Sequence, residues 1–484
     1  MTNSLFIDGV WQNGSGATFK SYDPATGKQL WQGAAADQSD VDRAFNVARA
    51  AFDAWSKTSL AQRIEIVENF KTLALEAKSE MGILIAKETG KVLWDATGEG
   101  GALSAKADIS IASYKDRTGD MCRDTAFGRA ALQHRAHGVM AVLGPYNFPA
   151  HLPNGQILPA LIAGNTVVFK PSEQCPDVGE ALTRLYERSG FPPGVINMVQ
   201  GARDTGGAIL GNSELDGILF TGSASTGAYI HKLFGGRPEI ILALEMGGNN
   251  PLIIWDVEDV DAAASLAVQS AFITSGQRCS CARRLILPGG TMGDKIVDAI
   301  VEQTNRLTLG SWQDGDQASI GPVISPDIAK FVVKSAKNLT EIGGTTLKPA
   351  KISGKGDAYV EPGIYDVTGV EVPDEEIFGP VLQIIRVSDW NAAITVANNT
   401  KFGLAAGLVS DDESRWEEFR SRIRAGVVNF NRPTTGAASF LPFGGPGASG
   451  NHNPGAYYAA DFCAWPMASQ IAPSPEFMPM KGTK

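Results

Sequence analysis

The chain has 484 residues, enough for about three domains of ordinary size, and 43% of them are apolar, as in a globular protein. Its 52 acidic and 42 basic residues give a formal charge of −10, which argues against nucleic acid as the main partner but permits a local basic pocket for an anionic substrate. Five cysteines, no signal peptide in residues 1–9 and no apolar run long enough to cross a bilayer predict a cytoplasmic protein without a membrane partner.

The first part of the chain divides into a short β-rich segment and a long helical one. Residues 1–30 have the pattern of short strands and turns. Residues 38–116 carry apolar positions at helical spacing, and the first helix is predicted to begin at Asp40 with Ser39 as its N-cap. Residues 114–137, which follow, contain polar, strand-like pieces.

Two blocks of alternating strands and helices come next. The strands expected in the first block are residues 138–144, 165–170, 194–200, 216–221 and 239–244. Those expected in the second are residues 252–255, 284–287, 381–387, 404–409 and 426–429. This alternation predicts an α/β fold with two doubly wound parallel-sheet domains, followed by an irregular tail over residues 471–484.

Cys279 is the first candidate for a catalytic residue. Arg278, Arg283 and Arg284 lie close to it in sequence, and positive charge favours the nucleophilic thiolate. Glu245, beside paired glycines, could activate water, so the two side chains suggest covalent catalysis through a thioester.

Cys279 has two other interpretations. It could be a small, buried and inert cysteine. It could instead belong, with Cys281, to a metal site, but the five histidines show no paired zinc spacing and we expect no metal.

A glycine-containing turn ends the strand at residues 216–221 and opens a helix. In such a turn, backbone N–H groups at a helix N-terminus can approach phosphate oxygens. The residues concerned are Gly222, Ser223, Ala224, Ser225, Thr226 and Gly227. Their glycine spacing is not Gly-x-Gly-x-x-Gly, so a plain strand-to-helix turn is the alternative.

Lys170, Ser172 and Glu173 stand at the end of another predicted strand, where ligands of open sheets bind. Glu173 could accept hydrogen bonds from ribose hydroxyls and would repel a 2′-phosphate, which predicts NAD rather than NADP. The alternative is a surface Lys and Glu that flank a turn.

Asn147 follows the first strand of the sheet, in a stretch flanked by prolines at both ends. A rigid amide there could donate to a developing oxyanion. It could equally cap the following helix, and spacing alone does not separate these alternatives.

Together these motifs resemble the aldehyde dehydrogenase superfamily. The resemblance rests on Glu245 with its glycines, on the Gly-Gln-Arg-Cys stretch that ends at Cys279, and on five further motifs. They are residues 145–149, 170–173, 220–223, 375–380 and 442–445, and they run in family order.

The resemblance implies a catalytic role for three residues. Cys279 would attack the aldehyde, and Asn147 with the Cys279 backbone N–H would hold the oxyanion. Hydride would pass to NAD, and Glu245 would activate the water that releases the acid from the thioester.

It also implies a cofactor site and a domain plan. Lys170 and Glu173 would bind the adenosine ribose, the 222–227 turn the pyrophosphate, and Glu376 and Phe378 the nicotinamide ribose and ring. A Rossmann-like NAD-binding domain would comprise residues 1–113 and 139–247, and a catalytic domain residues 248–438. An oligomerisation arm and C-terminal segment, residues 114–138 and 439–484, would build a homodimer or homotetramer.

Four stretches resemble one branch of the family, whose substrate is an acidic aldehyde with two carboxylates. They are residues 151–155, 245–251, 277–284 and 457–466. Such a small-molecule substrate requires cationic or amide donors. The candidates are Arg278 first, then His151, Asn154 and Arg432, with Phe443 from the 442–445 motif.

Alternatives remain for the recognition of this substrate and for the function. Arg278 could instead tune the thiol or form a structural ion pair. Many relatives have a bulky aromatic residue near Gly155, so a small residue there could widen the substrate tunnel. The substrate could be another small acidic aldehyde, such as succinate semialdehyde. A non-catalytic member of the fold would have lost Cys279 or Glu245, and both are present. A nucleotide-independent thiol hydrolase would need a histidine base near Cys279.

Overall fold

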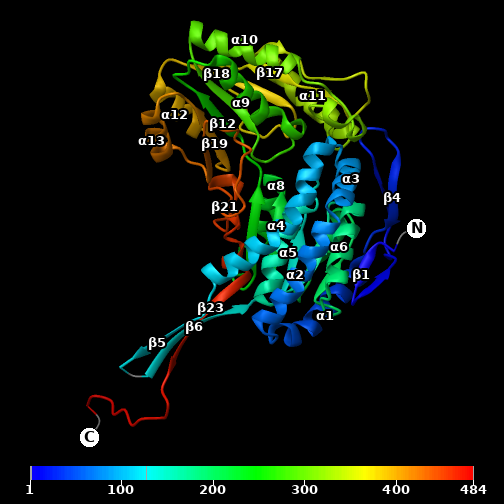
Figure 1. Cartoon of the computed structure of the whole chain (residues 1–484), viewed down its shortest axis with the longest axis vertical. Helices are drawn as coiled ribbons and strands as arrows, with labels where there is room; N and C mark the ends of the chain where they lie inside the picture. Colours follow the sequence, from blue (N-terminus) through cyan, green and yellow to red (C-terminus); the bar gives the residue numbers. More distant parts are fainter. Residues whose placement is uncertain (1–2, 127, 483–484) are drawn as a thin grey trace.

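Five parallel strands form the centre of the first sheet in the computed structural model, which describes residues 3–126 and 128–482. Its strand order is β11-β10-β7-β8-β9-β1-β2 (Figure 1). The parallel strands are β7 (Val139–Leu143), β8 (Thr166–Lys170), β9 (Ile196–Met198), β10 (Gly217–Gly222) and β11 (Ile241–Met246). An antiparallel hairpin, β1 (Leu5–Ile7) and β2 (Val10–Gln12), extends the sheet at one edge.

Helices cover both faces of this sheet because its strands are apolar on both sides. Val139 and Ala141 pack in one core with α1 (Gln38–Ser56), α7 (Arg203–Leu210) and α8 (Ala224–Leu233). Met140 and Val142, which point the other way, pack in a second core. Its helices are α2 (Leu60–Glu76), α3 (Lys78–Thr89), α4 (Leu93–Arg117), α5 (His151–Ala163) and α6 (Pro176–Ser189).

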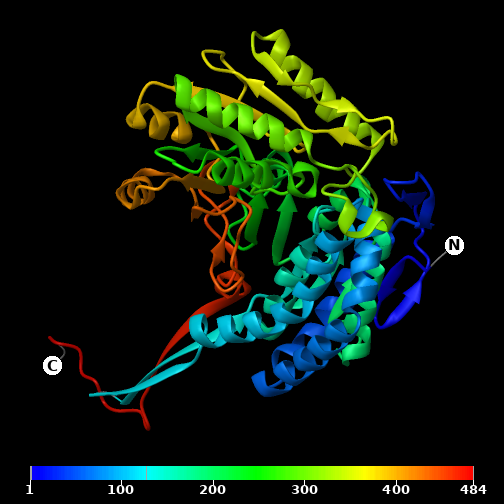
Figure 2. The ribbon, with the colours of Figure 1, turned by 45° about the horizontal axis from the view of Figure 1, so that its top comes forward.

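The predicted helical region 38–116 is therefore four helices: α2, α3 and α4 pack together on one face of the first sheet, below the second sheet in Figure 2, and α1 packs on the other face. The predicted start of the first helix is wrong. Asp37, not Ser39, is the N-cap: its side chain accepts from the Asp40 N–H, and the Asp40 side chain accepts in return from the Asp37 N–H. This reciprocal capping box satisfies two backbone donors, so the helix begins at Gln38.

The second sheet has the order β14-β17-β18-β13-β12-β19-β20. Its strands are β12 (Asn250–Ile254), β13 (Ala282–Pro288), β14 (Thr345–Lys348), β17 (Gly363–Asp366), β18 (Val381–Val387), β19 (Ala405–Val409) and β20 (Val427–Phe430), and only β14 pairs antiparallel. Helices α9 (Val260–Phe272) and α10 (Thr291–Asn305) cover one face, and α12 (Trp390–Asn398) and α13 (Glu413–Arg422) the other. The predicted α/β fold with two doubly wound sheets is confirmed.

Several elements were not predicted. Helix α11 (Pro326–Glu341) forms a separate small core with residues of β17 and with Val360 of β16. The short pair β15 (Lys351–Ile352) with β16 (Val360–Glu361) was not predicted either, whereas β3 (Thr18–Tyr22), paired with β4 (Gln29–Ala34), lies in the predicted β-rich segment 1–30.

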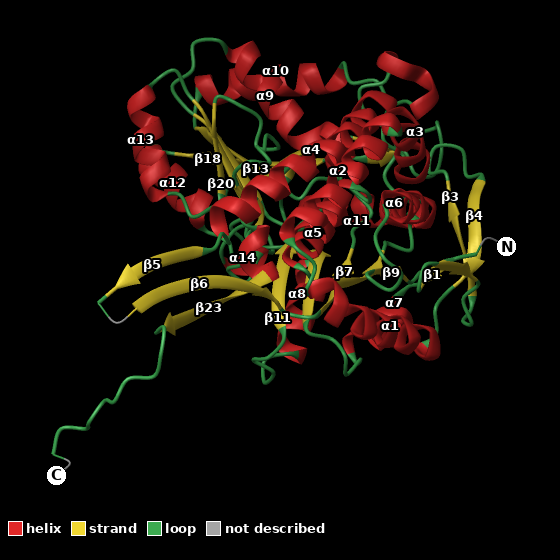
Figure 3. Ribbon diagram, turned by 60° about the horizontal axis from the view of Figure 1, so that its bottom comes forward, coloured by secondary structure: helices red, strands yellow, loops and turns green. Residues whose placement is uncertain are grey.

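A three-stranded antiparallel arm projects from the body of the molecule (Figure 3). It consists of β5 (Met121–Thr125), β6 (Gly128–Ala136) and β23 (Ala464–Ile471). The described tail beyond Ile471 has no helix or strand. Residues 442–463, which precede β23, do not belong to the arm. There β21 (Pro442–Phe443) pairs with β22 (Gly455–Ala456), and α14 (Ala459–Cys463) packs in the core with α4 and α5.

None of the helices in the described part of the chain combines the length and apolar character that a bilayer crossing needs.

Candidate active site

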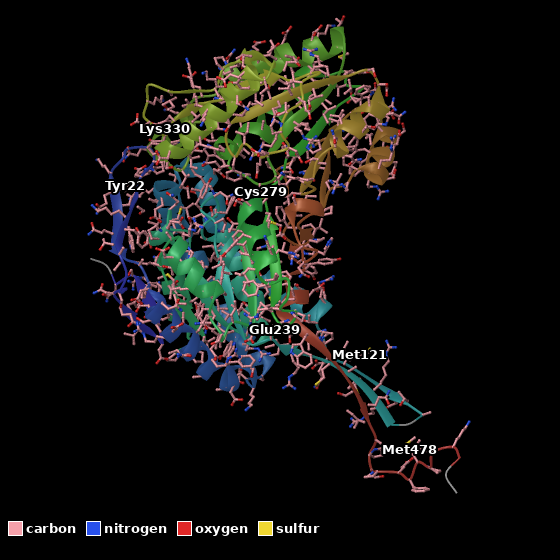
Figure 4. All side chains as sticks on the ribbon, turned by 180° about the vertical axis from the view of Figure 1, so that it is seen from behind. Tyr22, Met121, Glu239, Cys279, Lys330 and Met478 are labelled. Atoms are coloured by element: carbon pink, nitrogen blue, oxygen red, sulfur yellow. The ribbon has the colours of Figure 1, made fainter. Side chains whose placement is uncertain are left out.

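A strained loop carries Cys279 between the two α/β units (Figure 4). Thr274, Ser275 and Gly276 have φ values of 55°, 53° and 70°, a run of left-handed backbone that is unusual for the first two. A Cβ on Gly276 would lie 2.2 Å from the Gly379 carbonyl oxygen, so no other residue fits there. Asn250 Nδ2 donates to the Cys279 carbonyl at 2.7 Å, which fixes the backbone at the thiol.

The Cys279 thiol lies in an environment that favours its protonated form. Burial raises its pKa to about 12, and the carboxylates of Glu376 and Glu245 add to the rise. Arg283 opposes the rise but does not overcome it.

The prediction that neighbouring arginines favour the thiolate holds only for Arg283, whose charge lowers the pKa of the thiol without overcoming its burial. Arg283 pairs with Glu376 at 3.1 Å. Arg284 donates to backbone carbonyls, among them that of Asn249 at 2.8 Å. Arg278 pairs with Asp95 at 2.7 Å. The charges of Arg278 and Arg284 are engaged elsewhere and do not appear among the main influences on the thiol, whereas that of Arg283 reaches it.

Glu245 lies next to the end of β11, at the carboxyl edge of the first sheet. Its Oε1 accepts from the Gly455 N–H at 3.0 Å, and its buried Oε2 has no hydrogen-bond partner among the described residues. Burial raises the carboxyl pKa to about 8. A Cβ on Gly444 would lie 2.7 Å from Oε1, so the 442–445 motif leaves room for this carboxyl. An ionisable acid with one open oxygen can act as a general base in this position.

Asn147 reaches the nucleophile loop. Its Nδ2 donates to the Gln277 carbonyl at 2.9 Å, two residues before Cys279. It does not cap α5, because the N-cap position is Ala150 and the first backbone N–H groups of this helix donate to Glu99 Oε1 at 3.1 Å. An amide NH₂ carries two hydrogens, so one remains to donate to a substrate oxygen.

The glycine turn lies between β10 and α8, at the carboxyl edge of the first sheet. Ser223 is the N-cap of α8 and accepts from the Thr226 N–H at 3.2 Å. The first backbone N–H groups of a helix have no partner within it, so a phosphate can bind there.

Lys170 is buried at the end of β8, so the alternative of a surface lysine is wrong. Its ammonium donates to the Gly201 carbonyl at 2.7 Å and lies 3.5 Å from the Glu173 carboxylate. Ser172 is buried and accepts from the Gln174 N–H, whereas the Glu173 side chain is 44% exposed and available to a ligand.

Glu376 and Phe378 contact segments that follow strands of the first sheet, and the charge of Glu376 acts on the Cys279 thiol. A Cβ on Gly247 would lie 1.8 Å from Glu376 Oε2, which explains the bare glycine in the Glu-Met-Gly-Gly motif. The Phe378 ring packs edge-on against the Tyr146 ring at 6.1 Å between centroids.

Within the described residues, no group of three or more His, Cys, Asp or Glu side chains could hold a metal ion.

Comparison with known proteins fits this geometry. The model of the aldehyde dehydrogenase family matches residues 11–465. The chain belongs to the aldehyde dehydrogenase family. It is 51% identical, over 97% of its length and 96% of the relative's, to an N-succinylglutamate 5-semialdehyde dehydrogenase from Caulobacter sp. (strain K31), and 52% identical, over 96% of each chain, to one from Burkholderia mallei (strain SAVP1). Its fold matches a Mycobacterium tuberculosis aldehyde dehydrogenase complexed with NAD⁺, with a TM-score of 0.92 and 27% identity over 98% of this chain and 99% of that one.

In this aldehyde dehydrogenase the five substrate candidates differ in availability. Arg278 already has partners. It pairs with Asp95, its Nε donates to the Thr274 hydroxyl at 2.8 Å, and its guanidinium lies over the Phe148 ring. Asn154 is fully buried, with Nδ2 on the Leu103 carbonyl and Oδ1 accepting from the Tyr186 hydroxyl.

The other three candidates are less constrained. His151 has a buried Nδ1 without a partner among the described residues, and burial with nearby Lys106 and Lys91 lowers its pKa to about 3. Arg432 is exposed on the loop after β20. Phe443 is half-buried in β21, beside Gly444.

The expectation that Gly155 widens the tunnel is wrong. A Cβ there would lie 2.9 Å from Cε of Lys106, so the lysine side chain occupies the space that the glycine leaves. Lys106 was missed from the sequence because one lysine in a helical stretch has no distinguishing pattern.

Proposed function

We propose that this aldehyde dehydrogenase oxidises N-succinyl-L-glutamate 5-semialdehyde to N-succinyl-L-glutamate, a step of arginine degradation, with NAD as the oxidant. The observation that carries the chemistry is the convergence of Cys279, Glu245 and Asn147 where the two sheets meet. The substrate is supported by relatives of that name at 51–52% identity over nearly the whole chain.

The reaction divides between the three side chains. The Cys279 thiolate adds to the aldehyde carbon, and the free Asn147 N–H with the Cys279 backbone N–H donates to the resulting oxyanion. NAD, when bound, would supply the hydride acceptor for this oxidation, and Cys279 would then carry the acyl group as a thioester. Glu245 then takes a proton from water, which attacks the thioester and releases the acid.

The residues present fit this cofactor. The α8 N-terminus, with Gly222, Ser223, Ala224, Ser225, Thr226 and Gly227, would hold the pyrophosphate. Lys170, Ser172 and the half-exposed Glu173 would lie at the adenosine ribose, where the Glu173 carboxylate disfavours a 2′-phosphate. Glu376, whose charge acts on the Cys279 thiol, and Phe378, which packs against the Tyr146 ring, would contact the nicotinamide riboside.

A nucleotide-independent thiol hydrolase is disfavoured. The described groups whose charges act on the Cys279 thiol are two carboxyls, one cysteine and one arginine, with no histidine base among them.

We further propose that the chain forms a homodimer or homotetramer through its arm and that it works in the cytoplasm. The exposed strands of the arm support assembly, and five cysteines without a disulfide fit a reducing compartment.

The test is a comparison of kcat/KM for N-succinylglutamate 5-semialdehyde, succinate semialdehyde and a neutral aldehyde, each with NAD and with NADP. We expect the first substrate with NAD to be the best combination and Cys279→Ala to be inactive. A clear preference for succinate semialdehyde would favour the alternative substrate, and equal rates with NADP would contradict the role of Glu173.

A further inference from the structure

Three cations line the side of the site formed by α4, α5 and the Cys279 loop, and two of them have carboxylate partners. Arg278 pairs with Asp95 at 2.7 Å, and the buried Lys91 pairs with Glu99 at 2.7 Å. The third is Lys106, on α4.

Lys106 is buried without a partner. Its residue is only 5% exposed, and its ammonium makes no hydrogen bond or ion pair with a described residue. Burial alone lowers its pKa, to about 8, with no opposing carboxylate. The Lys106 Nζ atom is not among the fully buried nitrogen atoms without a partner, so a ligand can reach it. Because burial of the rest of the side chain disfavours its charge and no carboxylate offsets this, an anionic ligand would supply the missing partner.

The position of Lys106 connects it to the reaction site. Its side chain lies over Gly155, on the first turns of α5. The same turns carry His151, whose buried Nδ1 is also without a partner. Helix α5 follows directly on the loop in which Asn147 donates to Gln277, so these turns are the part of α5 nearest to the Cys279 loop.

We propose that the Lys106 ammonium binds a carboxylate of the substrate and is a specificity-determining residue of this enzyme. The inference rests on the proposed acidic substrate and names the group that recognises it. It replaces Arg278, whose charge Asp95 already neutralises, as the main anion-binding residue. A neutral His151 beside it can donate one hydrogen bond to the same carboxylate.

The test uses Lys106→Met, which keeps the length of the side chain and removes its charge, and Lys106→Arg, which keeps the charge. The matched control is Lys115→Met, because Lys115 is exposed on the same helix. The readouts are kcat/KM for N-succinylglutamate 5-semialdehyde and for a neutral aldehyde, and the Kd of the product N-succinylglutamate by calorimetry.

We expect Lys106→Met to lower kcat/KM for the acidic aldehyde about 10- to 100-fold, the usual effect of losing a charge-assisted hydrogen bond, mostly through KM. The Kd of N-succinylglutamate should rise by a similar factor, while the neutral aldehyde and the control variant stay unchanged. Because an unpartnered charge is removed, Tm should not fall, and Lys106→Arg should retain part of the affinity.

Comparison with N-acetylglutamate 5-semialdehyde, which lacks the succinyl carboxylate, identifies the carboxylate concerned. A loss confined to the succinyl compound assigns Lys106 to the succinyl end, and an equal loss for both assigns it to the α-carboxylate.

Two failures can be told apart. If the wild-type enzyme prefers the acidic aldehyde and Lys106→Met keeps the same preference and the same Kd, the role of Lys106 is overturned while the proposed function stands. If the wild-type enzyme does not prefer acidic aldehydes at all, the proposed substrate fails and this inference fails with it.

Discussion

At the scale of single residues, burial sets the protonation of the two reacting groups. It holds the Cys279 thiol protonated and raises the pKa of the Glu245 carboxyl to about 8. Two carboxylates near the thiol act in the same direction as burial, because negative charge disfavours a thiolate. A thiol with a raised pKa must lose its proton before it can attack, and negative charge on Glu245 makes that loss harder.

Glu245→Gln should separate hydride transfer from acid release. Glutamine keeps an oxygen that can accept from the Gly455 N–H but cannot take a proton from water. We expect steady-state kcat to fall about 10²- to 10⁴-fold, the usual contribution of a general base. Stopped-flow absorbance of the reduced nicotinamide should still show one turnover per site if Glu245 serves only acid release.

The control for this variant is Glu239→Gln, because Glu239 is exposed at the other end of the same strand region. The pH dependence gives an independent check. A base must be ionised to act, so the wild-type kcat should rise with pH up to about 8 and then level off, and this rise should be absent in Glu245→Gln. Wild-type activity that is flat between pH 6 and 9 (roughly the span over which such a carboxyl titrates) would contradict the assignment.

At the scale of elements, short apolar segments that alternate with helical ones were enough to predict the parallel strands of both sheets. A strand that is covered on both faces is apolar throughout, so it stands out in the sequence. The strands that the sequence did not reveal are short: β14 to β17 have two to four residues each, too few for a period to appear. Short length does not account for α11, which was also missed although it has 16 residues with buried apolar positions at helical spacing. Contacts between distant residues were equally hidden. The Arg278–Asp95 pair joins α4 to the Cys279 loop although the two residues are 183 positions apart in the sequence. No local sequence pattern predicts such a pair.

Helix α8 provides a test of the cofactor site at this scale. Ser223→Ala removes its N-cap, which should lower the free energy of unfolding by about 1 kcal/mol and loosen the backbone N–H groups proposed to bind the pyrophosphate. We expect a lower Tm together with a KM for NAD that rises several-fold.

Ser325→Ala is the matched control, since Ser325 caps α11 in the same way and belongs to another core. It should lower Tm by a similar amount and leave the KM for NAD unchanged. If Ser223→Ala behaves like this control, the turn serves stability alone and does not bind the cofactor.

At the scale of the whole molecule, the arm has exposed apolar side chains that packing within a single chain does not cover. It is exposed along β5 and largely half-buried along β6, and it projects away from both cores (Figure 3). The register of β23 on β6 places Trp465 opposite Arg135 and Ile471 opposite Arg129, so both apolar side chains lie on one face of the arm. Trp465 is 43% and Ile471 40% exposed. Large apolar side chains gathered on a protruding sheet are typical of a protein interface.

Charging this face should disrupt the proposed assembly. The double variant Trp465→Glu and Ile471→Glu places two carboxylates where an interface would bury apolar side chains, and burying an unpaired charge is costly. We expect sedimentation velocity to show a wild-type dimer or tetramer and a smaller species for the variant at the same concentration. Phe331→Glu is the control, because Phe331 is also exposed but lies on α11, away from the arm. If the variant and the control both keep the wild-type sedimentation coefficient, the arm is not the interface.

Cys279, Glu245 and Asn147 all come from the body of one chain. A dissociated variant that still folds should therefore retain its chemical step. Any loss of activity on dilution would then report loss of stability and not loss of a catalytic group.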